Sequence, residues 1–331
     1  MKIQRTNLKQ CLSSMLDSIT LVLQAKAIKQ LPPNEIRYFI IVTTGTIHVL
    51  DICLKFFPAN IQPVLLLNAM KNWEKNFIEE NYPAYKVIAF NSLRRAMIPH
   101  GKILDFLFTF HNEPFGILDS DSFVFDNTVF TKMASLQETT IVNACFKKQV
   151  GVVPLPQTFM LFFNTTLVNE IRKKYKVGSE EICYDRIPVA ARNTLAKLGI
   201  DQQHYPDGRD FFDTLHLLLS LGIADGYHVN YINIQNQKPG IDRGVYHVGG
   251  ITIRDKSPFK KLNETWRLRR AYFWYRALEV QKNYEIRRHY QQEYGTLDPD
   301  ALLTQHPLTV QIIGQDFFTN TEKIISQQNR D

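Results

Sequence analysis

Fully apolar runs alternate with helix-like segments through the first part of the chain. The runs at residues 37–42, 63–67, 85–90 and 115–118 predict strands, and residues 47–57, 72–81 and 99–111 predict helices between them. Strands without polar alternation are typical of a parallel sheet that is buried on both faces. The pattern therefore predicts an α/β fold with a mainly parallel central sheet and helices on both faces.

The pattern changes at both ends of this region. Near the N-terminus, apolar residues recur at steps of three and four and predict an amphipathic helix, which Pro32 and Pro33 end. Residues 260–290 predict one long helix with an aromatic stripe and a basic face. We predict three parts: an N-terminal helical extension (1–35), an α/β domain (36–255), and a basic, aromatic-rich helical extension (256–331).

Further elements are predicted after the fourth strand. Residues 141–153, 158–164, 228–234 and 244–248 predict strands, and residues 167–175 and 211–221 predict helices.

Two carboxylates follow the fourth strand. Asp119 and Asp121 come directly after residues 115–118, and further apolar residues follow them. Carboxylates one residue apart at a strand end can reach one divalent cation, and Mg²⁺ and Mn²⁺ favour such oxygen ligands. Ligands of parallel sheets bind at the carboxyl ends of the strands, so Thr43, Asn68 and Asp119 should share one rim. A loop with two solvated acids is the alternative.

A histidine offers a third ligand. His247 lies in a short predicted strand and is followed by Gly249 and Gly250. Imidazole suits Mn²⁺, and glycines allow backbone to approach phosphates closely. A histidine packed in a β-turn is the alternative.

The strand that runs into Asp119-Ser120-Asp121 resembles the DxD motif of glycosyltransferases with the GT-A fold. The resemblance covers residues 36–255 and includes residues 100–105, similar to the family's helix that enters the donor site. It implies a Rossmann-like GT-A domain that takes a nucleotide-diphosphate sugar as donor. It also implies Mn²⁺ or Mg²⁺ bound by Asp119 and Asp121, and by His247, since many members supply a late histidine.

The same resemblance implies the donor site. Nucleobase and ribose should lie at the end of the first strand, and Asn68 stands where many members carry an acid that reads the base. Arg95 could meet the diphosphate. The predicted donor-binding residues are Thr43, Thr44, Asn68, Arg95, His100, Asp119 and Ser120.

Two acids are candidates for the base of an inverting reaction, which takes the proton from the acceptor hydroxyl. Asp213 resembles the acid that opens the acceptor-side helix in inverting members, and Asp210 is the second candidate. Either could instead be a helix N-cap. Inversion is slightly favoured, and a retaining enzyme would need no such base.

Charge and cysteine usage bear on location and partners. The whole excess of +7 lies in residues 254–290, with 11 Lys/Arg against 4 Asp/Glu. Basic groups beside aromatics suit an anionic membrane surface, so peripheral contact through residues 260–290 is one hypothesis and a solvated basic face is the other. Nucleic acid is not an expected partner, since no recognised binding motif is present.

The four cysteines form no C-x-x-C pair. Reduced thiols predict a cytoplasmic protein, which the basic segment would place peripherally on the inner membrane face. The acceptor, whether glycan, lipid-linked or protein, stays open.

Three other functions compete with sugar transfer. A haloacid-dehalogenase-type phosphatase also uses strand-Asp-x-Asp, but normally after the first strand. A nucleotidyltransferase would carry a Gly-rich basic loop after the first strand, where this chain has Thr43-Thr44-Gly45-Thr46. A non-catalytic GT-A scaffold is the third alternative, and the presence of both acids and His247 argues against it.

Overall fold

A seven-stranded sheet forms the centre of the molecule. The computed structural model describes residues 2–91, 96–148, 153–204, 211–232, 240–251 and 261–327. The strand order is β3-β2-β1-β4-β7-β6-β8. These strands are β1 (Tyr38–Thr43), β2 (Val64–Asn68), β3 (Val87–Phe90), β4 (Phe115–Asp119), β6 (Thr140–Ala144), β7 (Met160–Phe163) and β8 (His228–Tyr231).

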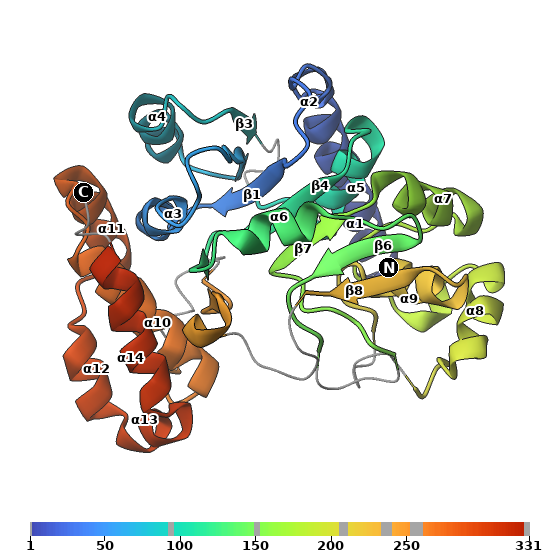
Figure 1. The fold of residues 1–331 in the computed structure, drawn as a ribbon. Coiled ribbons are helices and arrows are strands. Elements are labelled where there is room, and N and C mark those ends of the chain that lie inside the picture. The colour runs from blue at the N-terminus through green and yellow to red at the C-terminus, as the bar shows by residue number, and fades with distance from the viewer. Residues whose placement is uncertain are drawn as a thin grey trace.

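The sheet is parallel except for one strand. β3, β2, β1 and β4 pair in parallel. β7 runs antiparallel to both β4 and β6, and β8 is parallel to β6. Helices cover both faces (Figure 1), so the predicted α/β class with a mainly parallel sheet is confirmed.

Helices connect and cover the strands. The α-helices before β9 are α1 (Lys2–Val22), α2 (Ala25–Lys29), α3 (Ile47–Leu54), α4 (Asn72–Asn81), α5 (His100–Phe110), α6 (Thr128–Ala134), α7 (Thr165–Tyr175), α8 (Val189–Leu195) and α9 (His216–Ala224). After β9 come α10 (Thr265–Glu279), α11 (Tyr284–Tyr294), α12 (Pro299–Gln305), α13 (Pro307–Ile313) and α14 (Gln315–Ser326). Short 3-10 helices lie at Tyr184–Arg186, Ala196–Leu198 and Ile241–Arg243.

The two faces of β1 enter two separate cores, because successive side chains of a strand point to opposite sides. Tyr38, Ile40 and Val42 pack with α3, α6 and the C-terminal helices. Phe39 and Ile41 pack with α2, α5 and α7 to α9. The C-terminal helices gather at one end of the sheet beside α3 (Figure 1).

A second, small sheet joins two distant parts of the chain. β5 (Ser122–Val124) pairs antiparallel with β9 (Val245–His247), and Ser122 lies opposite His247. β5 follows the Asp119-Ser120-Asp121 turn directly, so this ladder brings the predicted histidine back to the carboxylates.

Three predicted helices differ from the observed ones. The first is divided into α1 and α2. The helix predicted over residues 211–221 begins only at His216, because Leu215 has φ 69°, outside the right-handed helical region. The long helix of residues 260–290 is also wrong. It breaks between α10 and α11, where the Asn283 side chain caps the new helix by accepting the amide hydrogens of Glu285 and Ile286.

Four neighbouring aromatic side chains of the C-terminal segment are part of the core. Tyr272, Phe273, Trp274 and Tyr275 are at most 5% exposed and pack in the same cluster as β1. These four rings therefore do not face a membrane, whereas Trp266 is 51% and Tyr284 64% exposed, and the membrane contact of residues 260–290 stays a hypothesis. Among the helices that the structure describes, none is both long and apolar enough to span a bilayer.

The domain boundaries stay predictions. The boundary between residues 255 and 256 lies outside the described residues. At the other boundary, α1 is tied to α5 by an ion pair between Asp17 and Lys102 of 3.2 Å.

His48 links α3 to the C-terminal helices and should make folding sensitive to acid. Its ring is fully buried, and Nε2 lies 3.1 Å from the carbonyl oxygen of Trp274. Burial lowers the pKa of His48 to about 3, below the ~6.5 of an unfolded chain. The unfolded chain then binds the proton first, so stability falls as pH drops from about 6.5 towards 3.

We expect the free energy of unfolding to fall by about 2 kcal/mol more in the native chain than in His48→Gln between pH 7 and pH 5. Urea titrations at both pH values would measure it. His228→Gln, at an exposed position on β8, is the matched control and should behave like the native chain. Equal losses in all three proteins would contradict the assignment.

Candidate active site at the carboxyl ends of the strands

A cleft of about 1100 Å³ opens at the carboxyl ends of β1, β2 and β4. Several parts of the chain that are far apart in sequence line it. They include Thr43, Thr44, Asn68, Ile98, His100, Asp119, Thr158, Glu180, Glu181, Asp213, Leu215, Gly250, Trp266, Arg267 and Arg270. The position is where open α/β sheets commonly bind ligands.

The predicted rim is present. In the ladder, Thr43 lies opposite Asn68 and Ile41 lies opposite Asp119, and all four residues line the cleft. The Asn68 amide donates to and accepts from the backbone of Ile98, both at 2.9 Å. Asn68 therefore holds the segment before α5 against the cleft and keeps one N–H for a ligand.

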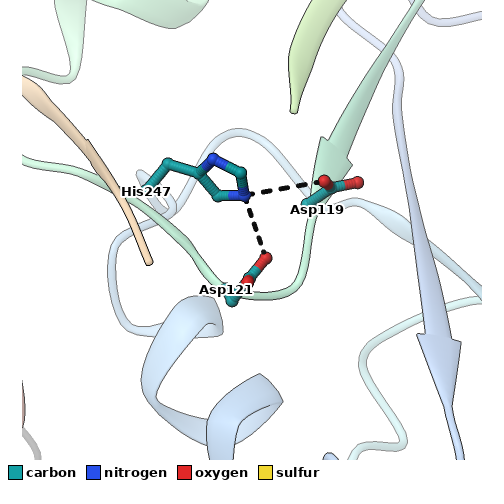
Figure 2. Close-up of side chains that lie close together, drawn as sticks. All are labelled: Asp119, Asp121 and His247. Atoms are coloured by element: carbon teal, nitrogen blue, oxygen red, sulfur yellow. Dashed lines mark ion pairs between the residues drawn. The ribbon is translucent and has the colours of Figure 1, made fainter. Parts of the chain in front are cut away.

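Asp119, Asp121 and His247 form one cluster. Figure 2 shows the imidazole pointing at both carboxylates. His247 Nε2 lies 3.4 Å from Asp121 Oδ1 and 3.7 Å from Asp119 Oδ2. The Asp119 side chain is 32% exposed and the Asp121 side chain 7%, so Asp119 faces the cleft and Asp121 lies behind it. Ser120 is buried in the turn between them.

Backbone geometry and packing hold the cluster. The β5–β9 ladder places His247, and the Phe159 ring stacks on the imidazole with centroids 4.4 Å apart. Gly249 and Gly250 both have positive φ, 83° and 74°, which glycine adopts without steric cost. After this bend, the amide of Ile251 donates to Asp121 Oδ2 at 3.3 Å.

Burial and the neighbouring charges shift the pKa values of all three groups of the cluster. Burial and the charge of Asp121 raise the pKa of Asp119 to about 7. For Asp121, burial is outweighed by His247 and by the Ile251 amide, and its pKa lies below the usual value. Burial would lower the pKa of His247, but the two carboxylates raise it. Without further charge, two acids and one imidazole are crowded together at one corner of the cleft.

This arrangement fits a divalent cation. The three side chains each offer a ligand atom, and these atoms lie within 4.8 Å of one another. The buried His247 Nε2 has no hydrogen-bond partner, and its distances to the carboxylates exceed those of an ordinary N–H···O bond. Oxygen and imidazole ligands suit Mg²⁺ and Mn²⁺.

Asp213 lies on the cleft wall. Its carboxylate is 3.8 Å from Lys148 Nζ and accepts the amide hydrogen of Thr214 at 2.8 Å. It is not the N-cap of α9, because that position belongs to Leu215, so the capping alternative does not hold for this acid. Asp210 and Arg95 lie outside the described residues.

Three of the other predicted donor residues reach the cleft. Thr43 and Thr44 follow one another at the end of β1, and His100 begins α5. Ser120 is not among the residues that line it.

Sequence reasoning missed the contribution of α10 to this cleft. Trp266, Arg267 and Arg270 line the wall, and both guanidinium groups contact the Trp266 ring at 4.5 and 5.0 Å. Arg270 Nη1 donates to the Gly250 carbonyl at 2.7 Å, so this arginine lies beside the loop that holds Asp121. These residues were assigned to an apolar stripe and a solvated basic face, because helical spacing cannot show which neighbour a face meets.

Comparison with known protein families finds a similarity for part of the chain. Residues 22–168 match the family model of the StrH glycosyltransferase N-terminal domain. No curated protein matches the chain.

Two solved structures align with the chain at low identity. Glycosyltransferase GlyE of Streptococcus pneumoniae TIGR4 aligns at 13% identity over 82% of this chain and 63% of that chain, with a TM-score of 0.38. S. aureus TarS 1–349 in complex with UDP-GlcNAc aligns at 9% identity over 78% of this chain and 70% of that chain, with a TM-score of 0.35. This chain therefore spans less than two thirds of the GlyE chain.

The matched segment contains β1 to β4, the Asp119-Ser120-Asp121 turn and β7. The likeness to the StrH glycosyltransferase N-terminal domain therefore covers the part of the chain that carries the two carboxylates.

Proposed function

We propose that the protein transfers a sugar from a nucleotide-diphosphate donor to an acceptor hydroxyl with the help of Mn²⁺ or Mg²⁺. The observation that carries this proposal is the Asp119–Asp121–His247 cluster at the edge of a large cleft in a glycosyltransferase domain. A divalent cation held there would neutralise the charge that develops on the diphosphate as the sugar departs. The acceptor is not assigned.

Donor binding is assigned to the rim formed by β1 and β2 and to the wall formed by α10. The nucleoside would lie against Thr43 and Thr44, which line the cleft. Arg267 and Arg270 would face the diphosphate, since guanidinium groups pair well with phosphate oxygens. Arg270 is well placed for this because it contacts the backbone next to the cluster.

Asp213 would act as the general base. The acceptor oxygen attacks the anomeric carbon, the bond from that carbon to the diphosphate oxygen breaks, and the nucleoside diphosphate leaves. The hydroxyl proton passes to the Asp213 carboxylate. Lys148 Nζ lies 3.8 Å from this carboxylate. Inversion at the anomeric carbon follows from this single displacement.

We further propose a reducing, cytoplasmic setting. The described cysteines Cys53, Cys145 and Cys183 are all free thiols, as expected where disulfides are kept reduced.

The donor proposal predicts nucleotide binding that needs metal. Thermal unfolding would be followed with UDP, GDP, CDP, TDP and ADP, each with Mn²⁺ and with EDTA. One nucleotide should raise the melting temperature of the native chain with Mn²⁺ only, by mass action, and Asp121→Ala should lose the effect. No shift under any condition would contradict the donor site and favour the phosphatase or scaffold alternatives.

The crowded charges predict that the site costs stability without metal. Asp119→Asn keeps the shape of the side chain but removes one of two neighbouring negative charges. We expect a melting temperature about 2 °C higher than that of the native chain in EDTA, together with a loss of the Mn²⁺ response. The control is Asp242→Asn, an acid with a side chain 75% exposed, which should change neither. A lower melting temperature for Asp119→Asn in EDTA would contradict this account.

A base role for Asp213 predicts a selective loss of turnover. Asp213→Asn should lower kcat by about 10²- to 10⁴-fold and leave nucleotide affinity within about twofold of the native value, given that the base acts on the acceptor. Steady-state kinetics with the identified donor and isothermal titration with the nucleotide would measure both. Glu181→Gln is the matched control, a second carboxylate on the cleft wall. If both variants lose turnover equally, Asp213 is not the base.

A further inference from the structure

A buried carboxylate outside the cluster lies directly behind the cleft. Glu74 on α4 is 0% exposed. Each of its oxygens accepts two hydrogen bonds. Oε1 accepts from the Gly45 amide at 2.6 Å and the Tyr290 hydroxyl at 2.7 Å. Oε2 accepts from the Thr44 hydroxyl at 2.7 Å and the Lys71 amide at 3.0 Å.

Two of these donors, Thr44 and Gly45, belong to the loop that follows β1 at the edge of the cleft. Thr44 lines the cleft, and Gly45 follows it with φ 80°. Glu74 therefore fixes both the side chain of Thr44 and the backbone direction just after it. The proposed mechanism gives Glu74 no chemical step.

The C-terminal helices hold the same loop from its other side. The Tyr290 hydroxyl of α11 donates to Glu74 and accepts the amide hydrogen of Ile47 at 3.2 Å. Trp274 of α10 donates from Nε1 to the Gly45 carbonyl at 2.7 Å. Both backbone groups of Gly45 are thus bonded to side chains from other elements, one from α4 and one from α10.

Because the network is buried, the hydrogen bonds to Glu74 depend on one another. A carboxylate removed from water must have its hydrogen bonds supplied by protein, and the loss of one donor leaves an uncompensated charge. Burial and the neighbouring Glu74 charge raise the pKa of Tyr290 well above its usual range, so the hydroxyl keeps its proton and donates. If α11 were not docked, Glu74 would lose the hydrogen bond from the Tyr290 hydroxyl. The Ile47 amide would also lose its acceptor.

We propose that Glu74 is a positioning residue of the donor site, which holds Thr44 and Gly45 in the conformation that binds the nucleoside diphosphate. Tyr290 couples this conformation to the docking of α10 and α11. The proposal rests on the proposed function for the identity of the ligand. It makes the C-terminal helices part of the donor site twice, through Trp266, Arg267 and Arg270 on the wall and through the Glu74 network behind it.

The test compares two equal chemical changes in the full chain. Tyr290→Phe removes the hydroxyl that meets Glu74. Tyr275→Phe removes a hydroxyl of α10 that donates to the Tyr294 carbonyl at 3.0 Å. Glu74→Gln is a second variant, which keeps the shape and removes the charge. For each protein, amide hydrogen exchange at residues 43–47 and the affinity for UDP, GDP, CDP, TDP and ADP with Mn²⁺ would be measured.

We expect exchange at residues 43–47 to rise in Tyr290→Phe and Glu74→Gln and to stay at the native rate in Tyr275→Phe. Nucleotide affinity should fall about tenfold in the first two variants and by less than about twofold in the control. Unchanged exchange at residues 43–47 overturns the proposal whatever the nucleotide does. Faster exchange with unchanged affinity also overturns it. Faster exchange in a protein whose native form binds no nucleotide overturns the proposed function and leaves Glu74 a role in folding alone.

Discussion

Asp119, Asp121 and His247 are crowded together where β4 ends, with Asp121 buried and the other two partly exposed. The segments around them are arranged to hold these groups close to one another. Charged groups removed from water need partners. The Ile251 amide, the stacked Phe159 ring and the β5–β9 ladder supply order around the cluster. Such an arrangement is not one that packing alone would favour. The arrangement fits the cation proposed for this site, which would supply the missing charge compensation.

The sequence was most informative where the chain buries continuous apolar runs. β1 to β4 lie within or close to the predicted ranges, because strands covered on both faces leave no polar alternation to confuse the pattern. The carboxylate pair was found for the same reason, as two acids at the end of such a run. Strands of three residues, such as β5 and β9, carry no measurable period. Their pairing depends on contacts across the chain, so the route by which His247 reaches Asp121 could not be seen in the sequence.

The C-terminal helices mark the second limit. A basic and aromatic helix has the same pattern whether its apolar side meets lipid or a protein core. Here Trp274 and Tyr290 pack against His48, which fixes the helices on α3. The break before α11 depends on a local interaction, in which the Asn283 side chain caps the first turn of α11. The role of Trp266 and Arg270 depends on where α10 lies relative to the cleft. The spacing of apolar residues along the helix does not determine this position.

The ladder between Ser122 and His247 also has a consequence for the order of folding. These residues are far apart in the chain, and closing so long a loop costs entropy that only late, cooperative contacts repay. The two carboxylates lie one residue apart in the sequence. The imidazole can join them only after β9 has paired with β5. An incompletely folded chain therefore presents two acids but not three ligands. Full chelation of a cation is then a property of the finished fold, and metal bound by all three side chains would slow unfolding more than it would speed folding.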